Sequence, residues 1–359
     1  MSQLRVLIAG GGTGGHIIPA LAVAHELVAH YEAGVMFVGT SRGLESRLVP
    51  EAGFPLRLIE VGQFNNVSPL VRIRTLSGLP LSVLACSRLI NDFRPAVVFG
   101  VGGYASWPAM TSALLRRLPT MVFEPNAVPG LVNRQVGRFV SSAAVNFPQA
   151  ARWFRNAEVT GIPVRPEFFS LPEPRLDAAP HLLIFGGSQG ARIFNRILPE
   201  LVSALLEAVP GLTILHQAGI RNAEATESAY LASGADPERW QVCAYLDDMP
   251  EQFSRAHLVL ARGGASTVAE LAAAGKPALL VPFAAAADSH QLRNAEAMVV
   301  AGASELLLES DVKNGLLPQL TELLTDPARL ARMSTAARSQ AHPHAAQRIA
   351  QILAELALT

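Results

Sequence analysis

A chain of 359 residues is longer than one compact α/β unit usually needs, so two domains of similar size are expected. Half of the residues are hydrophobic and 16% are charged, which is typical of a packed globular protein and excludes extensive disorder. The formal net charge of zero argues against nucleic-acid binding.

The overall balance hides a difference in charge between the two halves. Residues 1–165 contain 15 Arg and 8 acidic residues, a net charge of +7, and the remainder carries −7. The first half is therefore expected to meet an anionic partner, either a lipid surface or a phosphorylated substrate. Simple variation in surface composition is the alternative explanation.

The cysteines and the apolar segments indicate the cellular compartment in which the chain is expected to work. Cys86 and Cys243 match no metal-ligand spacing, so neither a metal site nor a disulfide framework is expected. The apolar run 4–9 is too short for a signal peptide, and no segment has the length of a bilayer span. We expect a chain from a reducing cytosol that, if it works at a membrane, lies on its surface.

In the first half, short apolar runs alternate with helix-length stretches, which is typical of a parallel sheet covered by helices. The first run, 4–9, leads into a glycine cluster and an amphipathic helix pattern over 17–29. The further predicted strands are 35–38, 56–61, 96–99, 120–123 and 142–145. Proline and glycine become dense over 161–180, which indicates a domain boundary.

The second half begins in the same way, with a predicted strand, a glycine loop and a helix. The predicted strands are 181–185, 212–215, 241–244, 258–260 and 278–281, and the pattern is helical beyond about 311. We predict an α/β fold of two doubly wound, Rossmann-like domains, 1–163 and 164–359, with a last helix that can cross back to the first domain. Because ligands bind at the carboxyl ends of such strands, one site is expected in a central cleft.

The first glycine loop, 10–15, matches GxGxxG between a strand and a helix, so its amides can hold a phosphate. NAD binding is disfavoured, since residues 39–41 after the second strand lack the acid that holds the ribose. A Walker loop is disfavoured because His16 stands in place of the lysine. His16 is a candidate proton acceptor, with a capping or packing role as the alternative.

Polar groups of the second half also follow strands or glycine turns. Loop 186–192 offers the Ser188 hydroxyl and a helix N-terminus to a diphosphate leaving group, unless it is an ordinary tight turn. Glu270 can bind two sugar hydroxyls, but Thr267 and Glu270 also match a capping box. Gln291 has the same ambiguity, because Asp288 could cap a helix with Gln291 in its first turn.

Two further features belong to the first half. Tyr104 and Glu124 each follow a predicted strand, where Glu124 is either a base or hydroxyl anchor or a plain loop charge. Segment 69–89 combines apolar and Arg residues, as a membrane-surface helix does, although a helix packed on the sheet has a similar pattern. Gly78 and Pro80 are expected to interrupt this helix.

Several longer motifs occur together, in order, over nearly the whole chain. They are GGGTGGHIIPALAVA (10–24), GTSRGLESRLVP (39–50), GVGGYASWPA (100–109), EPNAVPGLVN (124–133), TGIPVR (160–165), GGSQGAR (186–192), DDM (247–249) and GGASTVAELAAAGKPALLVPF (263–283). In these motifs the chain resembles the MurG family of bacterial glycosyltransferases.

The resemblance implies a GT-B fold and a metal-free, cofactor-free inverting transfer in peptidoglycan synthesis. N-acetylglucosamine would move from UDP-N-acetylglucosamine to the C4 hydroxyl of undecaprenyl-diphosphate-linked muramyl-pentapeptide. The second half would bind the donor, and the first half the lipid acceptor, at the cytoplasmic face of the inner membrane as a peripheral protein. An anionic membrane surface and cell-wall assembly proteins are the further partners implied.

The resemblance also assigns roles to residues. His16 would be the base, with Glu124 and Tyr104 assisting it or anchoring the acceptor, while Leu246 would hold uracil through its backbone and Glu270 would grip the ribose. The expected donor-binding residues are Thr13, Gly14, Gly15, Asn126, Arg165, Ser188, Leu246, Ala265, Ser266, Thr267, Val268, Ala269, Glu270, His290 and Gln291.

Two departures from the family pattern and three rival functions bear on this assignment. Phe123 and Pro125 stand where the family often has His and Gln, and the alanine run 284–287 offers the sugar no polar side chain. The rival functions are a UDP-sugar 2-epimerase, a diacylglycerol-type lipid glycosyltransferase and a non-catalytic UDP-sugar-binding subunit.

Overall fold

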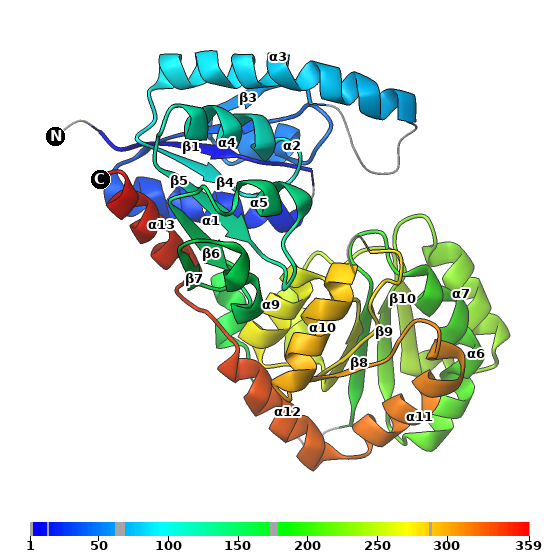
Figure 1. Cartoon of the computed structure of the whole chain (residues 1–359). Helices are drawn as coiled ribbons and strands as arrows, with labels where there is room; N and C mark the ends of the chain where they lie inside the picture. The colour runs from blue at the N-terminus through cyan, green and yellow to red at the C-terminus, as the bar shows by residue number, and fades with distance from the viewer. Residues whose placement is uncertain (1–2, 13, 62–68, 173–178, 287–288, 359) are drawn as a thin grey trace. The chain divides into compact units, whose positions relative to one another are not determined.

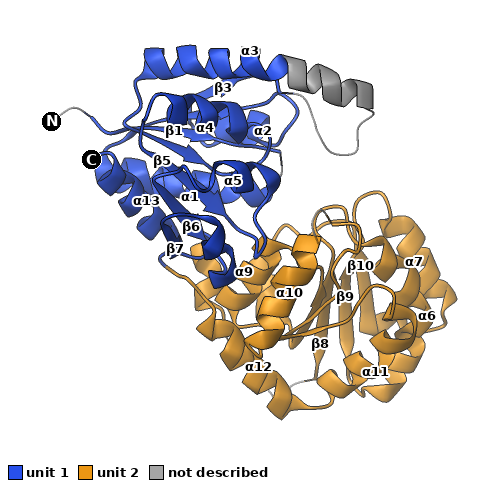
Figure 2. Cartoon of the chain, in the orientation of Figure 1, with its two compact units in different colours: residues 1–163, 344–359 blue, residues 164–343 orange. Residues whose placement is uncertain are grey.

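The computed structural model describes residues 3–12, 14–61, 69–172, 179–286 and 289–358, with side chains from residue 78 onward in the helix that begins at Pro69. The chain divides into two compact units, Met1–Pro163 with His344–Thr359, and Val164–Pro343 (Figure 2). Each unit is a parallel sheet covered by helices, which confirms the predicted fold class (Figure 1).

The described strands of the first unit form a seven-stranded sheet in the order β3-β2-β1-β4-β5-β6-β7. Its strands are β1 (Arg5–Ala9), β2 (Gly34–Gly39), β3 (Leu56–Leu58), β4 (Val97–Gly100), β5 (Thr120–Glu124), β6 (Ser142–Val145) and β7 (Ala157–Val159). Its helices are α1 (Gly14–Tyr31), α2 (Glu45–Glu51), α3 (Pro69–Phe93), α4 (Ser106–Leu115), α5 (Leu131–Val136), η1 (Pro148–Trp153) and α13 (Ala345–Leu356). The central strands are buried on both faces, which explains their continuous apolar runs.

The second unit has a six-stranded sheet in the order β10-β9-β8-β11-β12-β13 among the described residues. Its strands are β8 (His181–Phe185), β9 (Thr213–Gln217), β10 (Trp240–Cys243), β11 (Leu258–Ala261), β12 (Ala278–Leu280) and β13 (Ser304–Leu306). Its helices are η2 (Pro166–Ser170), α6 (Arg192–Ala208), α7 (Ala223–Ala232), η3 (Pro237–Arg239), α8 (Met249–Arg255), α9 (Ala265–Ala274), α10 (His290–Val300), α11 (Val312–Leu324) and α12 (Pro327–Ser339).

The C-terminal helix α13 belongs to the first unit, so the second unit ends at Pro343 and not at residue 359. The helix packs along α1, and its buried Ile349 and Leu353 supply the apolar contacts. Arg348 adds a two-pronged ion pair to Glu158 of β7, with N–O distances of 2.6 and 2.8 Å. This return of the chain was allowed for in the sequence analysis, although the predicted boundaries left the helix in the second domain.

In each sheet, the glycine loop follows the strand at which the order of strand addition reverses. β1 lies between β2 and β4, and β8 lies between β9 and β11. The connections from β1 and β8 therefore leave toward one side of the sheet and those of β4 and β11 toward the other. Ligands of open α/β sheets bind at this switch point, beyond the carboxyl ends of the strands.

One sequence expectation about helices was wrong. Helix α3 runs without a break from Pro69 to Phe93 through Gly78 and Pro80, where the Ser82 hydroxyl donates to the carbonyls of Glu60 at 2.6 Å and Gly78 at 3.2 Å. The stretch beyond 311 is helical, as predicted, and it forms the separate helices α11, α12 and α13, with Asp326 capping α12 by accepting a hydrogen bond from the Arg329 amide at 2.8 Å. Sequence analysis also missed the short strands β7 and β13.

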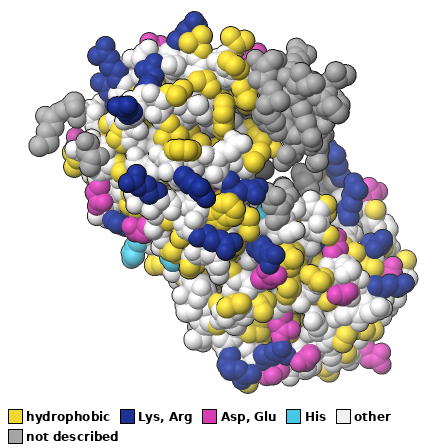
Figure 3. Space-filling model, viewed as in Figure 1, with side chains coloured by type: hydrophobic (Ala, Val, Ile, Leu, Met, Phe, Trp, Pro, Cys, Tyr) yellow, Lys and Arg dark blue, Asp and Glu magenta, His cyan; other side chains and the backbone are white. Residues whose placement is uncertain are grey.

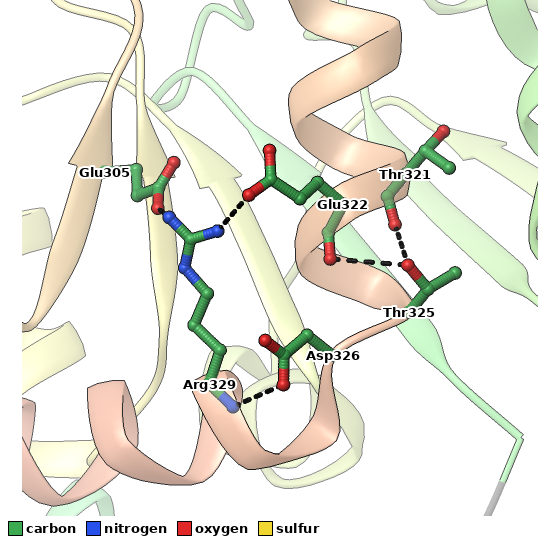
Figure 4. Close-up of polar contacts among 6 residues, drawn as sticks. All are labelled: Glu305, Thr321, Glu322, Thr325, Asp326 and Arg329. Carbon is green, nitrogen blue, oxygen red and sulfur yellow. Dashed lines mark hydrogen bonds and ion pairs between the residues drawn. The ribbon is translucent and has the colours of Figure 1, made fainter.

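Arg329 fixes the corner between α11, α12 and β13 (Figure 4). Its guanidinium pairs with Glu322 of α11 at 2.5 Å and also with Glu305 of β13. The Thr325 hydroxyl donates to the carbonyl of Thr321 at 2.7 Å and closes the end of α11. The cluster is structural, since every charge in it is paired within the second unit.

Candidate active site

A buried carboxylate organises the first glycine loop. Glu45, which is 0% exposed, accepts hydrogen bonds from the Gly12 amide at 2.8 Å and from the amide and hydroxyl of Thr40 at 2.9 Å each. A Cβ on Gly11 or Gly43 would lie 2.1 or 2.0 Å from a Glu45 oxygen. A side chain at either position would therefore displace the Glu45 carboxylate from its hydrogen bonds. Because the Gly12 amide is already used, it is not available to a phosphate, contrary to the simple phosphate-loop interpretation.

Replacing Glu45 by glutamine is expected to loosen this loop. The amide has one acceptor oxygen instead of two, so its NH2 group must face the Gly12 or the Thr40 amide, which costs about 1–3 kcal/mol in the free energy of unfolding. We expect a lower Tm and a kcat/KM reduced by about tenfold. Glu51→Gln is the matched control, since Glu51 lies on the same helix and its side chain is 57% exposed. Equal behaviour of the two variants in thermal unfolding would contradict this role of Glu45.

His16 lies in the first turn of α1 against the loop that follows β4. A Cβ on Gly102 would be 2.8 Å from Cε1 and 3.0 Å from Nδ1 of the His16 ring. The neighbouring Gly103 packs on the first glycine loop, where a Cβ would lie 2.4 Å from the Gly11 carbonyl oxygen. Both glycines have positive φ, 93° and 75°. The loop therefore holds His16 in place and leads directly into half-buried Tyr104.

Glu124, at the end of β5, uses both carboxylate oxygens within its own loop. Oε1 accepts from the amide of Asn126 at 3.0 Å and from its side chain at 3.2 Å. Oε2 accepts from the Gly130 amide at 3.0 Å and from the Asn133 side chain at 2.9 Å. Burial raises the pKa of Glu124, and these hydrogen bonds oppose that shift. A carboxylate with four donors is suited to holding loop 125–133 in shape, and less suited to the base or acceptor anchor predicted from the sequence.

In the second unit, the loop after β8 is a compact turn with an exposed hydroxyl. The Gly190 amide donates to the Gly187 carbonyl at 2.9 Å, and a Cβ on Gly190 would lie 2.0 Å from the Ala218 carbonyl oxygen. This close contact with the β9 loop fixes the start of α6. Ser188 stands exposed at the tip of the turn, ahead of the free amides of that helix.

Helix α9 begins at Ala265 after Gly264, so Thr267 lies inside the helix and the capping-box alternative for Thr267 and Glu270 was wrong. Glu270 therefore does not cap the helix. Burial raises its pKa to about 7, against the lowering effect of the Arg165 charge. Residues 265–270 thus bring a helix N-terminus and a carboxyl group that changes its protonation near neutral pH to the same edge of the sheet.

Gln291 is held by the loop after β12, since its Oε1 accepts from the Phe283 amide at 3.0 Å. Helix α10 begins at His290 after Ser289, so Gln291 is its second residue. His290 is half-buried beside it. A Cβ on Gly263 would lie 2.3 Å from the Gln291 carbonyl oxygen, so Gly263 allows α10 to approach the α9 turn.

The remaining predicted residues distribute over the two units. Gly14 and Gly15 begin α1, and Asn126 lies in the Glu124 loop of the first unit. Half-buried Leu246 follows β10, and exposed Arg165 precedes η2, with its guanidinium 5.1 Å from the Phe168 ring centre. Thr13 and Asp288 lie outside the described residues. No group of three His, Cys, Asp or Glu suited to a metal ion occurs in the described ranges.

Sequence comparison supports the assignment of both units to one enzyme class. Residues 6–145 match the glycosyltransferase family 28 N-terminal domain, and residues 181–349 match the family 28 C-terminal domain. The chain is therefore a glycosyltransferase.

More specific similarity comes from individual proteins. The UDP-N-acetylglucosamine–N-acetylmuramyl-(pentapeptide) pyrophosphoryl-undecaprenol N-acetylglucosamine transferase of Solibacter usitatus is 44% identical over 98% of this chain and 96% of its own length. The crystal structure of Acinetobacter baumannii MurG has a TM-score of 0.83 at 31% identity and covers 98% of this chain and 99% of that one. The chain belongs to the MurG family, and its GT-B fold is confirmed.

A UDP-N-acetylglucosamine 2-epimerase also aligns, over 97% of this chain and 95% of its own, with a TM-score of 0.66 and 14% identity. At this identity the likeness shows the fold alone. It explains why the sequence left an epimerase open as a rival, since the paired sheets are common to both.

Proposed function

We propose that this enzyme transfers N-acetylglucosamine from UDP-N-acetylglucosamine to the C4 hydroxyl of undecaprenyl-diphosphate-linked muramyl-pentapeptide, the lipid I to lipid II step of peptidoglycan synthesis. The observation that carries the proposal is the 44% identity over 98% of the chain to a transferase named for these substrates. Both glycine loops, His16, Glu270 and Gln291 stand at the carboxyl ends of strands or in the helix turns that follow, as a ligand site in this fold requires.

The second unit binds the donor. The Leu246 backbone takes the uracil, residues 265–269 meet the nucleotide at the start of α9, and Glu270 accepts hydrogen bonds from the ribose hydroxyls. Ser188 and the first amides of α6 meet the diphosphate, with Arg165 adding a positive charge. Gln291 and His290 contact the sugar. This arrangement is supported by the position of Glu270 inside α9, where its carboxyl group does not cap the helix.

The first unit supplies the base and meets the acceptor. His16 removes the proton from the muramyl C4 hydroxyl as its oxygen bonds to the anomeric carbon, and the bond from that carbon to the UDP oxygen breaks with inversion. The charge that develops on UDP is stabilised by helix amides. Thr13, Gly14, Gly15 and Asn126 contribute to the donor from this unit, and Tyr104 contacts the acceptor. Glu124 acts on the site through its loop.

The test of the function is UDP release from UDP-N-acetylglucosamine with and without a short-chain muramyl-pentapeptide-diphosphate lipid. Acceptor-dependent release that forms the disaccharide lipid is expected. Isomerisation of the donor without acceptor would support an epimerase instead, and release that depends on diacylglycerol would support the other lipid transferase. Tight donor binding with no turnover under any condition would leave only the binding-subunit function.

Peripheral membrane binding through α3 and α4 forms part of the proposal. None of the described helices is both long enough and apolar enough to cross a bilayer. Leu81, Leu84 and Leu115 are 70%, 48% and 76% exposed on these two neighbouring helices. Exposed Arg88 and Arg116 lie on the same helices or at their ends. Figure 3 shows hydrophobic side chains beside Arg side chains on one face of this unit. An anionic bilayer at the cytoplasmic side is the partner with matching chemistry, and cell-wall assembly proteins would be met there.

Changing Leu81 and Leu84 together to serine is expected to weaken binding to vesicles that contain phosphatidylglycerol by tenfold or more, because each leucine buried in the interface contributes about 1 kcal/mol or more. Co-sedimentation measures the partition. Leu231→Ser, in the second unit at 61% exposure, is the control and should bind as the unmodified protein does. Equal binding by all three proteins, or no preference for anionic over neutral vesicles, would refute this surface.

A further inference from the structure

Arg262 is a buried cation at the ligand-binding edge of the second sheet that the proposed donor site does not use. It follows β11, and its guanidinium donates to the Val281 carbonyl at 3.0 Å and to Oε1 of Glu309 at 3.0 Å. The rings of Phe194 and Phe283 each lie 5.3 Å from it. The guanidinium therefore forms hydrogen bonds along its edge and contacts two aromatic rings. These interactions are within the protein, so we do not assign Arg262 to a phosphate.

Glu309, the partner of Arg262, follows β13 and connects the pair to a loop. Its second oxygen, Oε2, accepts from the Ala284 amide at 2.9 Å. Burial raises the pKa of Glu309, but the hydrogen bonds from Ala284 and Arg262 outweigh it, so the pKa is lowered and the group is ionised at neutral pH. The pair spans the carboxyl ends of β11, β12 and β13, which are neighbours in the sheet.

The loop 281–284 is held by this pair at three successive places. They are the Val281 carbonyl, the Phe283 ring and the Ala284 amide. Between the first and the last of these places lies the Phe283 amide, which donates to Oε1 of Gln291. The only acceptor atom of the Gln291 side chain is thereby occupied, and its NH2 group is the part left to donate to a ligand oxygen.

We propose that Arg262 and Glu309 form a positioning pair that sets the orientation of the Gln291 amide through loop 281–284, and so determines how strongly the sugar of the donor is recognised relative to the nucleotide. The inference rests on the proposed contact between Gln291 and the sugar. Neither Arg262 nor Glu309 touches the ligand in this arrangement. The alanines at 284–286 add no polar side chain, so the orientation of Gln291 depends on the backbone of its loop.

The test compares the affinities for UDP-N-acetylglucosamine and for UDP. In Glu309→Gln, the charge that holds Arg262 is lost, and we expect the Kd of UDP-N-acetylglucosamine to rise about tenfold while that of UDP changes less than twofold. Arg262→Lys should act in the same direction, because an ammonium group cannot span Val281 and Glu309 as a planar fork does. Arg262→Lys is the variant to use if Glu309→Gln folds poorly, and thermal unfolding measures whether it does.

Glu305→Gln provides a matched control. Its side chain is 22% exposed, as is that of Glu309, and it pairs with Arg329 in the same unit away from loop 281–284. Both affinities should be unchanged in this variant. If the Glu309 and Arg262 variants weaken the binding of UDP and of UDP-N-acetylglucosamine equally, or weaken the binding of neither ligand, the pair is merely structural and the inference is overturned.

Gln291→Ala separates this inference from the proposed function. It should lower the preference for UDP-N-acetylglucosamine over UDP, as Glu309→Gln does. The double variant of Gln291→Ala and Glu309→Gln should lose no more of this preference than either single variant. If Gln291→Ala lowers the preference but Glu309→Gln and Arg262→Lys do not, the positioning pair fails and the Gln291 contact stands. If Gln291→Ala leaves the preference intact, both the Gln291 contact and the positioning pair fail.

Discussion

His16→Ala is expected to reduce kcat for acceptor-dependent transfer by about a hundredfold or more, with little change in the KM of UDP-N-acetylglucosamine. General-base catalysis typically contributes about 10²–10⁴-fold, and the loss falls on the chemical step because the donor is bound mainly by other residues. The ring is held against Gly102, which keeps the imidazole in one position beside the first glycine loop. Steady-state kinetics with the short-chain lipid acceptor measure the effect.

His30→Ala controls for the loss of a histidine from the same helix. Its side chain is 65% exposed at the far end of α1, and the variant should retain full activity. A fall of less than threefold in kcat for His16→Ala would remove His16 as the base. A fall in donor affinity without a change in kcat would instead make it a binding residue.

Glu270→Ala should raise the Kd of UDP-N-acetylglucosamine by about a hundredfold. The ionised carboxylate can accept two hydroxyl hydrogen bonds from the ribose, and charged hydrogen bonds contribute about 1.5–3 kcal/mol each. Isothermal titration with the normal donor and with its 2′-deoxy analogue measures the effect. The variant should no longer distinguish the two ligands, whereas the unmodified protein should prefer the hydroxylated one. A variant that still prefers the hydroxyl would show that another group reads the ribose.

The same contact predicts a pH dependence of donor affinity. The pKa of Glu270 is about 7 in the free protein, so the carboxyl group is largely protonated at pH 6 and largely ionised at pH 8. Ribose hydroxyls donate to the ionised form, and affinity should therefore rise with pH through this range. UDP-N-acetylglucosamine is the proper ligand, because both of its phosphates are esterified and do not titrate there. The profile should be flat for Glu270→Gln.

The fold could be predicted from the sequence because strands buried on both faces appear as continuous apolar runs, and two glycine loops each stood between a strand and a helix. The short strands β7 and β13 were missed since each has a glutamate at its centre, which interrupts the apolar run, whereas the equally short β12 is wholly apolar. The unbroken α3 was missed because Pro80 suggested an interruption, and the hydrogen bond from Ser82 to Glu60 cannot be foreseen from spacing.

The place of a candidate residue could be predicted where it lies a few residues beyond its strand, as Ser188 and Tyr104 do, and its role stays a prediction. Glu45 was missed as a structural centre, although its place just after the turn 39–43, which contains two glycines, was a usable signal. Its role depends on glycines at 11, 39 and 43 coming together, and only the packed structure shows this. Glu124 was expected to work on the acceptor, and its four hydrogen bonds within the loop point to support instead.

The place of α13 in the first unit bears on how the protein is made. The second unit is an insertion in a chain whose first unit is completed only by residues 344–359. During synthesis, α1 therefore exposes the apolar surface that α13 will cover until the last residues of the chain have been made. A protein shortened at its C-terminus would retain every proposed catalytic and donor-binding residue and still leave its N-terminal half unfinished.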